Sequence, residues 1–147
     1  MEYGRPIVQP KEISSLRRVI LIVDDKQSSR DLLRAILDDK YLVLEASDGE
    51  EALSMAFEAI PQLVILDIHM PKRDGFGVVR ELRKDPTLQD VPIMALTASA
   101  SLDEKDRIMN SGFDACFVKP IGPTKLRDAV AALLQNKPQL RRPRSPI

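Results

Sequence analysis

Five short apolar runs, each followed by an amphipathic stretch, restrict the fold of this sequence more than any other feature. The runs, rich in branched aliphatic residues, are VILIV (19–23), YLVLEA (41–46), LVIL (63–66), VPIMAL (91–96) and ACFV (115–118). Strands that alternate with helices form a parallel sheet with helices packed on it. The first and third runs are apolar throughout, as expected for interior strands covered on both faces. The pattern predicts a single α/β domain of five βα units.

The stretches between the runs carry apolar residues at helical spacing, so each is expected to bury one face on the sheet. These residues are Leu32, Leu33, Ile36 and Leu37 in the first helix, Ala52, Leu53, Ala56, Phe57 and Ile60 in the second, and Leu126, Val130, Leu133 and Leu134 in the last. Turn and capping signals predict where helices begin or end. They are Ser47-Asp48-Gly49, Asp74-Gly75, Asp85-Pro86 and Ser101.

The length of 147 residues fits one domain with additional tails. We expect a leader over residues 1–17, the domain over 18–135, and a basic, proline-rich tail or the start of a linker over 136–147. The sequence has no run of about eighteen apolar residues and no signal-peptide core, which favours a soluble, cytoplasmic protein. The single cysteine, Cys116, cannot form an internal disulfide and fits a reducing compartment.

Charge is distributed unevenly although the formal net charge is zero. Residues 19–135 hold 14 bases against 20 acids, whereas the tail carries only bases, at Lys137, Arg141, Arg142 and Arg144. Such a tail could contact nucleic acid or an acidic surface, but its prolines and lack of aromatic residues favour a solvated end.

Reactive side chains follow four of the five expected strands. Ligands of an open parallel sheet bind outside the carboxyl ends of its strands. These ends carry Asp24 and Asp25 after the first strand, Asp67 after the third, Thr97 after the fourth and Lys119 after the fifth. Each alone could be a helix cap or a solvated charge. Together, three carboxylates repel one another by on the order of 1 kcal/mol per pair at about 4 Å in water, so an oxygen-bound cation, best Mg²⁺, is expected.

Asp67 is the candidate nucleophile of this set. Apolar neighbours flank it, and a carboxylate can attack phosphorus to form an acyl phosphate on the protein. Phosphoryl transfer needs positioning and neutralised oxygens, which Mg²⁺, Lys119 and the Thr97 hydroxyl can supply. The sequence therefore predicts phosphorylation of Asp67.

The sequence resembles the response-regulator receiver domain of two-component signalling over about residues 18–135. The matching segments are VILIVDD (19–25), LVILDIHMPKRDGF (63–76), IMALTA (93–98) and FVKPI (117–121). The resemblance implies a flavodoxin-like, doubly wound sheet of five parallel strands in the order 2-1-3-4-5, with five helices. It also implies a histidine kinase or a phosphotransfer protein as the phosphoryl donor.

The resemblance implies a role for each site residue. Asp24 and Asp25 are the acidic pair at the metal, Asp67 is the phosphoacceptor, Thr97 is the hydroxyl that follows the phosphoryl group, Lys119 is its counter-ion, and the backbone carbonyl of His69 completes the metal site. Lys119-Pro120 is expected to be a cis peptide. By its side chain, His69 is expected to tune water access to the phosphoaspartate.

One position departs from the family. An aromatic residue that reports phosphorylation often precedes the last-strand lysine by three positions, and here that residue is Cys116. Phe117 is expected on the opposite face of the strand. The signal is therefore expected to pass through the 98–102 loop and the fourth helix.

Output is expected to come from a downstream protein partner or from a domain missing from this sequence, without direct contact to a membrane or nucleic acid. The fourth helix, fifth strand and fifth helix form the family's usual partner face, which includes Asp103, Arg107 and Lys125, so homodimerisation is plausible.

Three alternatives remain at this stage. A phosphohydrolase would use Asp67 for turnover but needs a second carboxylate two residues on, where this chain has His69. A flavin or nucleotide carrier would place a cofactor phosphate against the acidic loop DDKQSSR, and no GxGxxG segment is present. A degenerate receiver that serves only as a docking module would not need every reactive position filled. We therefore expect a phosphoacceptor that catalyses only its own phosphorylation and dephosphorylation and is otherwise no enzyme.

Overall fold

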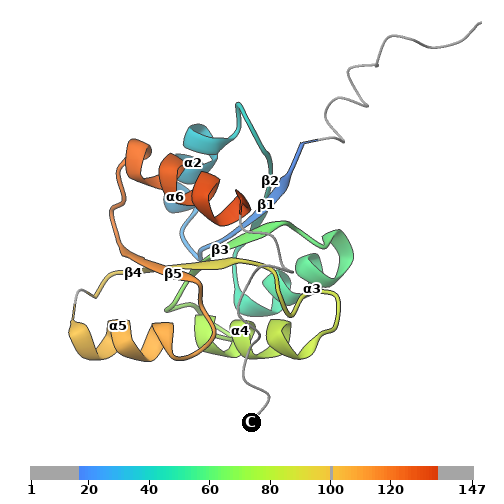
Figure 1. The fold of residues 1–147 in the computed structure, drawn as a ribbon, viewed down its shortest axis with the longest axis vertical. Coiled ribbons are helices and arrows are strands. Elements are labelled where there is room, and N and C mark those ends of the chain that lie inside the picture. Colours follow the sequence, from blue (N-terminus) through green and yellow to red (C-terminus); the bar gives the residue numbers. More distant parts are fainter. Residues whose placement is uncertain (1–16, 100, 136–147) are drawn as a thin grey trace, which may run out of the picture.

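The computed structural model describes residues 17–99 and 101–135 (Figure 1). They form one five-stranded parallel sheet in the order β2-β1-β3-β4-β5, which confirms the predicted order. The strands are β1 (Val19–Val23), β2 (Leu42–Ala46), β3 (Leu63–Asp67), β4 (Ile93–Thr97) and β5 (Ala115–Val118). Apart from Arg17, the predicted leader and tail lie outside the described residues.

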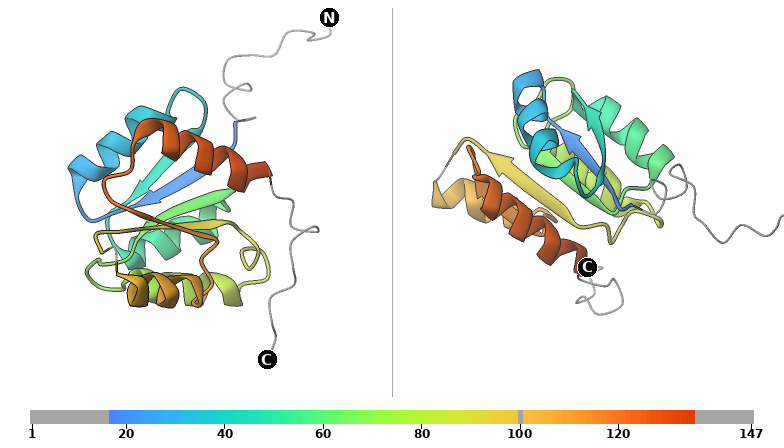
Figure 2. Two further views of the ribbon diagram at one scale, coloured as in Figure 1. Left: turned by 60° about the vertical axis from the view of Figure 1, so that its left-hand side comes forward. Right: turned by 90° about the horizontal axis from the view of Figure 1, so that it is seen from above.

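Five helices cover the two faces of the sheet. They are α2 (Gln27–Leu37), α3 (Gly49–Ala59), α4 (Gly75–Lys84), α5 (Leu102–Met109) and α6 (Pro123–Gln135). Helices α2 and α6 lie on one face, and α3, α4 and α5 lie on the other (Figures 1 and 2). None of these described helices combines the length and the apolar character needed to cross a bilayer.

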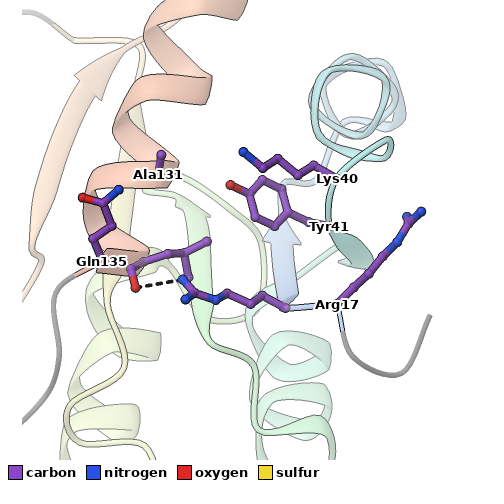
Figure 3. A pocket seen from close by; sticks show the side chains of 7 residues that line it. Arg17, Lys40, Tyr41, Ala131 and Gln135 are labelled. Carbon is purple, nitrogen blue, oxygen red and sulfur yellow. Dashed lines mark hydrogen bonds between the residues drawn. The ribbon is translucent and has the colours of Figure 1, made fainter. Parts of the chain in front are cut away.

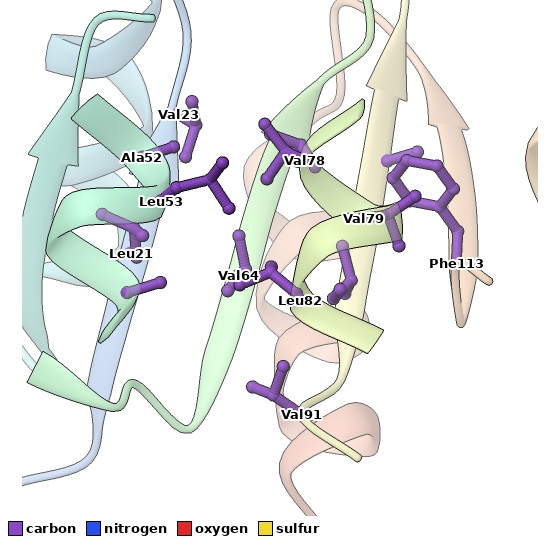
Figure 4. Close-up of a cluster of buried hydrophobic side chains, with 14 of the residues drawn as sticks. Leu21, Val23, Ala52, Leu53, Val64, Val78, Val79, Leu82, Val91 and Phe113 are labelled. Atoms are coloured by element: carbon purple, nitrogen blue, oxygen red, sulfur yellow. The ribbon is translucent and has the colours of Figure 1, made fainter. Parts of the chain in front are cut away.

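The apolar core consists of one layer on each face of the sheet. Leu21 and Val23 of β1 point into the layer under α3, α4 and α5, while Ile20 and Ile22 point into the layer under α2 and α6. This alternation follows from the two-residue period of a strand. Figure 4 shows Leu21, Val23 and Val64 facing the side chains of α3 and α4. Because apolar layers cover both faces of the sheet, the interior strands β1 and β3 are apolar at every position that faces either layer.

Three of the stripe residues are not buried as predicted. The exposed fractions are 53% for Leu32, 45% for Phe57 and 43% for Ile60. Leu32 and Phe57 lie at the edge of the apolar stripes of α2 and α3, and Ile60 follows the last residue of α3 as its C-cap in the left-handed conformation. The expectation that every stripe residue packs on the sheet is therefore wrong at these positions.

The helix starts agree with the capping signals. The side chain of Asp48 accepts a hydrogen bond from the Glu51 N–H at 2.8 Å, and that of Asp74 accepts one from the Gly77 N–H at 3.0 Å. Ser101 caps α5 in the same way. A side-chain cap satisfies an N–H that the helix leaves without a partner. Each cap thereby fixes the point where the chain leaves the rim of the sheet and enters a helix.

Two strands extend further than predicted at the functional rim. Asp67 is the last residue of β3 and pairs with Leu96, and Thr97 is the last residue of β4 and pairs with Val118. At the other rim, Tyr41 still donates its N–H to Leu37 at the end of α2, so it belongs to the turn and not to β2. The backbone of two of the site residues is therefore held by the sheet itself.

The loop after β3 returns close to the strand it has left. The Gly75 N–H donates to the Ile68 backbone oxygen at 2.8 Å. A Cβ added at Gly75 would lie 2.9 Å from the backbone oxygen of Asp67. Contacts below about 3 Å require the backbone to move, and overpacking of this kind costs typically about 1–3 kcal/mol. This close approach keeps the β3–α4 loop in place next to the end of β3.

We expect Gly75→Ala to lower the free energy of unfolding by about 2 kcal/mol, measured by urea denaturation, because the new Cβ forces the loop away from Asp67. Gly122→Ala is the matched control, since a Cβ there meets no atom within 4 Å, and its effect should stay below about 0.5 kcal/mol. Equal effects of the two substitutions would show that the approach at Gly75 does not constrain the loop.

Candidate functional site at the switch point of the sheet

Three carboxylates gather where the strand order reverses, between β1 and β3. Asp24 and Asp25 follow β1, and Asp67 ends β3. One oxygen from each of the three carboxylates lies within 4.8 Å of the others. In open parallel sheets such a switch point is the usual place for ligands. The structure therefore brings together the three acidic residues that the sequence predicted as one site.

Lys119 connects this cluster to β5. Its Nζ lies 3.0 Å from Oδ2 of Asp24 and 3.6 Å from Oδ2 of Asp67. Asp24 is 1% exposed and Asp67 is 7% exposed, whereas Asp25 is exposed to solvent. Lys119-Pro120 is a cis peptide as expected, and the Lys119 N–H donates to the Thr97 oxygen at 2.8 Å. The ammonium group offsets part of the negative charge, but one cation faces three carboxylates.

Burial raises the pKa of Asp67 above its ordinary value, because the charged form loses hydration. The positive charge of Lys119 acts in the opposite direction and lowers the pKa, while the charges of Asp24 and Asp25 raise it further. The His69 backbone N–H, hydrogen-bonded to the carboxylate, also lowers it. Burial and the two neighbouring carboxylates therefore destabilise the ionised form of Asp67.

Lys119 responds to the same surroundings. Burial alone would lower the pKa of its ammonium group, but the hydrogen bond to Asp24 and the charges of Asp67 and Asp24 outweigh it, so the pKa lies above its ordinary value. Lys119 is therefore a permanent positive charge at the site.

Thr97 and His69 lie beside the cluster on different elements. Thr97 is 1% exposed, and its Oγ1 accepts a hydrogen bond from the Ser99 N–H at 3.1 Å. The His69 side chain is 64% exposed, and its Nε2 lies 3.7 Å from a carboxylate oxygen of Glu104 in α5. The side chain of His69 is therefore turned towards α5, and the role expected for its backbone carbonyl stays a prediction.

The donor set fits a hard divalent cation. Three carboxylates supply oxygen ligands of the kind that Mg²⁺ prefers, and a cation would stabilise the ionised form of Asp67, which burial first and the neighbouring carboxylates second disfavour. Asp25 is open to solvent, which suits an ion that keeps several waters. The residues present therefore fit the metal that the sequence predicted.

Sequence reasoning missed two charged residues that support the site, Arg30 in α2 and Glu45 in β2. Arg30 Nη1 donates to the Asp24 backbone oxygen at 2.7 Å, and its Nε donates to Glu45 Oε1 at 3.0 Å. The signal was present in the run YLVLEA, where a carboxylate occupies a strand that is otherwise apolar. A charge in such a strand requires a partner, and Arg30 and Arg34 both provide one.

The two residues at the position of the expected aromatic switch lie as predicted. Cys116 packs against the apolar layer under α3, α4 and α5, and Phe117 packs against the layer under α2 and α6. Lys125 of α6 lies over the Phe117 ring, 5.6 Å from its centroid. Burial raises the pKa of the Cys116 thiol, which keeps it protonated and apolar in character.

A hollow of about 340 Å³ lies beside β1 and the last turn of α6, and it holds none of the predicted site residues (Figure 3). Arg17 donates to the backbone oxygen of Asp38 at 3.1 Å, and Arg18 donates to that of Leu134 at 2.9 Å. Cations suit the carboxyl ends of helices, so these arginines have a structural role at the ends of α2 and α6.

The fold and the site together define a class of protein. A flavodoxin-like sheet of this order, with three carboxylates and one lysine at its switch point, is an α/β module with a ligand site at the carboxyl ends of its strands, and its sequence lacks the glycine-rich loop of nucleotide carriers.

Comparison with known proteins identifies the family. Residues 20–131 match the family model of the response regulator receiver domain. The chain is 44% identical over 117 residues to the "Probable transcriptional regulator ycf27" of Guillardia theta, which covers 79% of this chain and 45% of that protein. The matched segment thus spans about half of this relative.

Solved structures agree with this result. Chemotaxis response regulator CheY4 of Vibrio cholerae superposes with a TM-score of 0.76 at 32% identity, covering 80% of this chain and 98% of that one. The receiver domain of a Pseudomonas aeruginosa PAO1 sensor histidine kinase, with magnesium coordinated in its active-site cleft, gives 0.77 at 26% identity, covering 82% and 99%.

The chain therefore belongs to the response regulator receiver domain family and is a receiver domain of two-component signalling. Receiver domains bind Mg²⁺ at an acidic aspartate cluster and interact with histidine kinases and output domains.

The raised pKa of Asp67 predicts the pH dependence of stability without metal. The folded chain holds the Asp67 proton more tightly than the unfolded chain, so stability falls as pH rises from the ordinary value of 3.8 through the raised pKa. In EDTA, Asp67→Asn should therefore melt at a higher temperature than wild type at neutral pH, and the gain should shrink as pH falls towards 3.8.

Asp48→Asn is the control of opposite sign. The hydrogen bond from the Glu51 backbone N–H lowers the pKa of Asp48, so loss of that charge should not stabilise the chain at neutral pH. An Asp67→Asn variant that is less stable than wild type at neutral pH would contradict the inference that the ionised Asp67 carboxylate destabilises the folded chain.

Proposed function

We propose that this receiver domain takes a phosphoryl group from a phosphohistidine donor onto Asp67. Asp24, Asp25 and Asp67, together with the His69 backbone carbonyl, would hold Mg²⁺. The observation that carries the proposal is the buried Asp67 carboxylate, clustered with the other two and 3.6 Å from the Lys119 ammonium. A buried carboxylate with a fixed cation and an oxygen-rich neighbourhood is suited to attack phosphorus and to retain the product.

Phosphoryl transfer to Asp67 exchanges one bond to phosphorus for another. An Asp67 oxygen forms a bond to phosphorus, the phosphorus–nitrogen bond of the donor histidine breaks, and its electron pair stays on the imidazole. Bound Mg²⁺ would neutralise charge on the phosphoryl oxygens. Lys119 would pair with one of these oxygens, and the Thr97 hydroxyl would donate to another. Water later cleaves the acyl phosphate to inorganic phosphate and the free carboxylate.

The proposal includes no turnover of external substrates. A turnover phosphohydrolase would need an acid or base two residues after Asp67, and His69 there has its side chain beside Glu104 on α5. We assign to the domain only its own phosphorylation and dephosphorylation. We also propose a cytoplasmic location, because the domain must reach the phosphorylated histidine of its donor.

Output would pass to a protein partner or to a further domain, and a homodimer could form through the face of α5, β5 and α6. Leu102 is 76% exposed and Val118 is 37% exposed on these elements, which supports this face as a contact surface. Arg107, predicted as part of this face, is exposed, and its guanidinium also lies over the Phe76 ring of α4 at 3.9 Å from the centroid.

The donor would dock on a hollow of about 280 Å³ that adjoins the site. Asp24 and Lys119 form its polar side, and the other lining residues are Ser29, Leu32, Leu33, Leu96, Pro120 and Ile121. Leu32 is more than half exposed here, although it belongs to an amphipathic helix that could have buried it. An apolar side chain next to the phosphohistidine of the donor would fill this hollow and bring the phosphorus to Asp67.

Acetyl phosphate with Mg²⁺ should add one phosphoryl group to Asp67, detected as a mass shift of the intact chain. The label should be lost in hydroxylamine, as for an acyl phosphate, and should be absent in EDTA and in Asp67→Asn. Asp114→Asn provides a control carboxylate, because Asp114 is engaged with Arg83 far from the cluster. A mass shift that persists in Asp67→Asn would show that the acceptor is misassigned.

Leu32→Ala should slow phosphoryl transfer from a phosphorylated histidine phosphotransfer protein by about tenfold, because burial of a leucine side chain contributes about 1.5–3 kcal/mol. The rate with acetyl phosphate should stay unchanged, since this small donor needs no docking surface. Phe57→Ala, which truncates a similarly exposed side chain on the opposite face, is the control. Slowing of both donors by Leu32→Ala would argue against docking at this hollow.

A further inference from the structure

The loop from β1 to α2 carries two of the three carboxylates, and they are held very differently. The Asp24 carboxylate accepts hydrogen bonds from the Lys26 N–H at 2.9 Å and from the Lys119 ammonium at 3.0 Å. For Asp25, no hydrogen bond or ion pair of the carboxylate occurs among residues 17–99 and 101–135. Its position must therefore be set by the backbone to which it is attached.

The peptide group between Asp24 and Asp25 is fixed by one side chain. Its carbonyl oxygen, which belongs to Asp24, accepts the 2.7 Å hydrogen bond from Arg30. The preceding peptide group is held by the sheet, because the Asp24 N–H donates to the Ala46 backbone oxygen of β2 at 3.1 Å. Rotation about the Cα–C bond of Asp24 would move the Asp24 carbonyl oxygen and the Asp25 Cα together, and it would thereby displace the Asp25 carboxylate relative to Asp24 and Asp67. The bond from Arg30 opposes that rotation.

Arg30 can make this bond because Glu45 holds its guanidinium. The side chain of Arg30 is 12% exposed, and its Nε is paired with Glu45, whose neighbour in the sheet is Ile22 of β1. The pKa of Glu45 is lowered, first by the hydrogen bond from Arg34, against the effect of its burial, and further by Arg30. Glu45 is thus an ionised anchor on β2 for both arginines of α2.

We propose that Arg30 is a positioning residue of the metal site, which fixes the Asp24–Asp25 peptide so that Asp25 is already placed beside Asp24 and Asp67 when Mg²⁺ binds. The inference deepens the proposed function and rests on its metal site. A residue behind the ligands of a metal typically changes metal affinity by about 10- to 100-fold when it is lost.

Arg34 provides the matched control. It lies one turn after Arg30 on the same helix, and it is paired with the same carboxylate. Its other bonds go to the Val43 backbone oxygen and to Asp38, away from the β1–α2 loop. Arg34→Ala therefore removes one arginine from Glu45 without removing the bond to Asp24.

The test is to measure Mg²⁺ affinity by calorimetry and by the Mg²⁺ dependence of the melting temperature. Arg30→Ala should weaken Mg²⁺ binding about tenfold, and Arg34→Ala should change it less than about twofold. Arg30→Lys, which keeps the charge but cannot span Glu45 and the Asp24 oxygen with one planar group, should weaken binding as well. It also serves as the second variant if Arg30→Ala does not fold.

A double-mutant cycle separates positioning from a general loss of structure. In an Asp25→Asn background, Arg30→Ala should cause little further loss of Mg²⁺ affinity, because the ligand it positions is already lost. An undiminished loss in that background, or an equal loss in Arg34→Ala, would overturn the inference. If wild type itself shows no response to Mg²⁺, the metal site of the proposed function is wrong, and the inference falls with it. If wild type binds Mg²⁺ and Arg30→Ala binds it equally well, only the inference about Arg30 is wrong.

Discussion

Repulsion among three carboxylates at the ends of two neighbouring strands is the interaction that the rest of the structure must offset. Asp24 and Asp67 are almost completely buried, and Asp25 lies within reach of both. Nothing local favours such an arrangement, because like charges brought out of water raise each other's pKa. The two apolar layers of the sheet supply the stability that holds the acids together, and Lys119 offsets only part of the charge. A bound divalent cation would offset the negative charge that Lys119 leaves uncompensated.

The scaffold around this cluster removes freedom from each chain segment that leaves the rim. The end of β3 is held by pairing with β4 and by the close return of the loop at Gly75. The end of β1 is held by Arg30 and by the Lys26 N–H, and α3, α4 and α5 begin at side-chain caps. Preorganised ligands lower the cost of ordering the site when an ion or a phosphoryl group binds. The residues that surround the acids are therefore as much a part of the site as the acids.

A short path of hydrogen bonds leads from the site to α5. Thr97 accepts from the Ser99 N–H, the Ser99 hydroxyl accepts from the Ser101 N–H, and Ser101 caps α5. A phosphoryl group shifts an equilibrium only through contacts that differ between two states, and a Thr97 hydroxyl turned towards it would alter the first bond of this path. The small side chain of Cys116 leaves little volume to exchange on β5. The β4–α5 loop is therefore where we expect the phosphorylated and unphosphorylated states to differ.

The sequence by itself determined the alternation of strands and helices, the carboxyl-end positions of Asp24, Asp25, Asp67, Thr97 and Lys119, and the capping residues. These follow from local periodicity and from turn chemistry, which act over a few residues. The strand order came from the family resemblance and not from periodicity. Only the tertiary structure decided which face of α2 is left open, so that Leu32 lines a hollow beside the site, and which partners Glu45 and Arg30 find. These depend on how a helix is rotated against the sheet and on contacts between residues distant in the chain, and neither quantity is encoded in the spacing of residues along one segment.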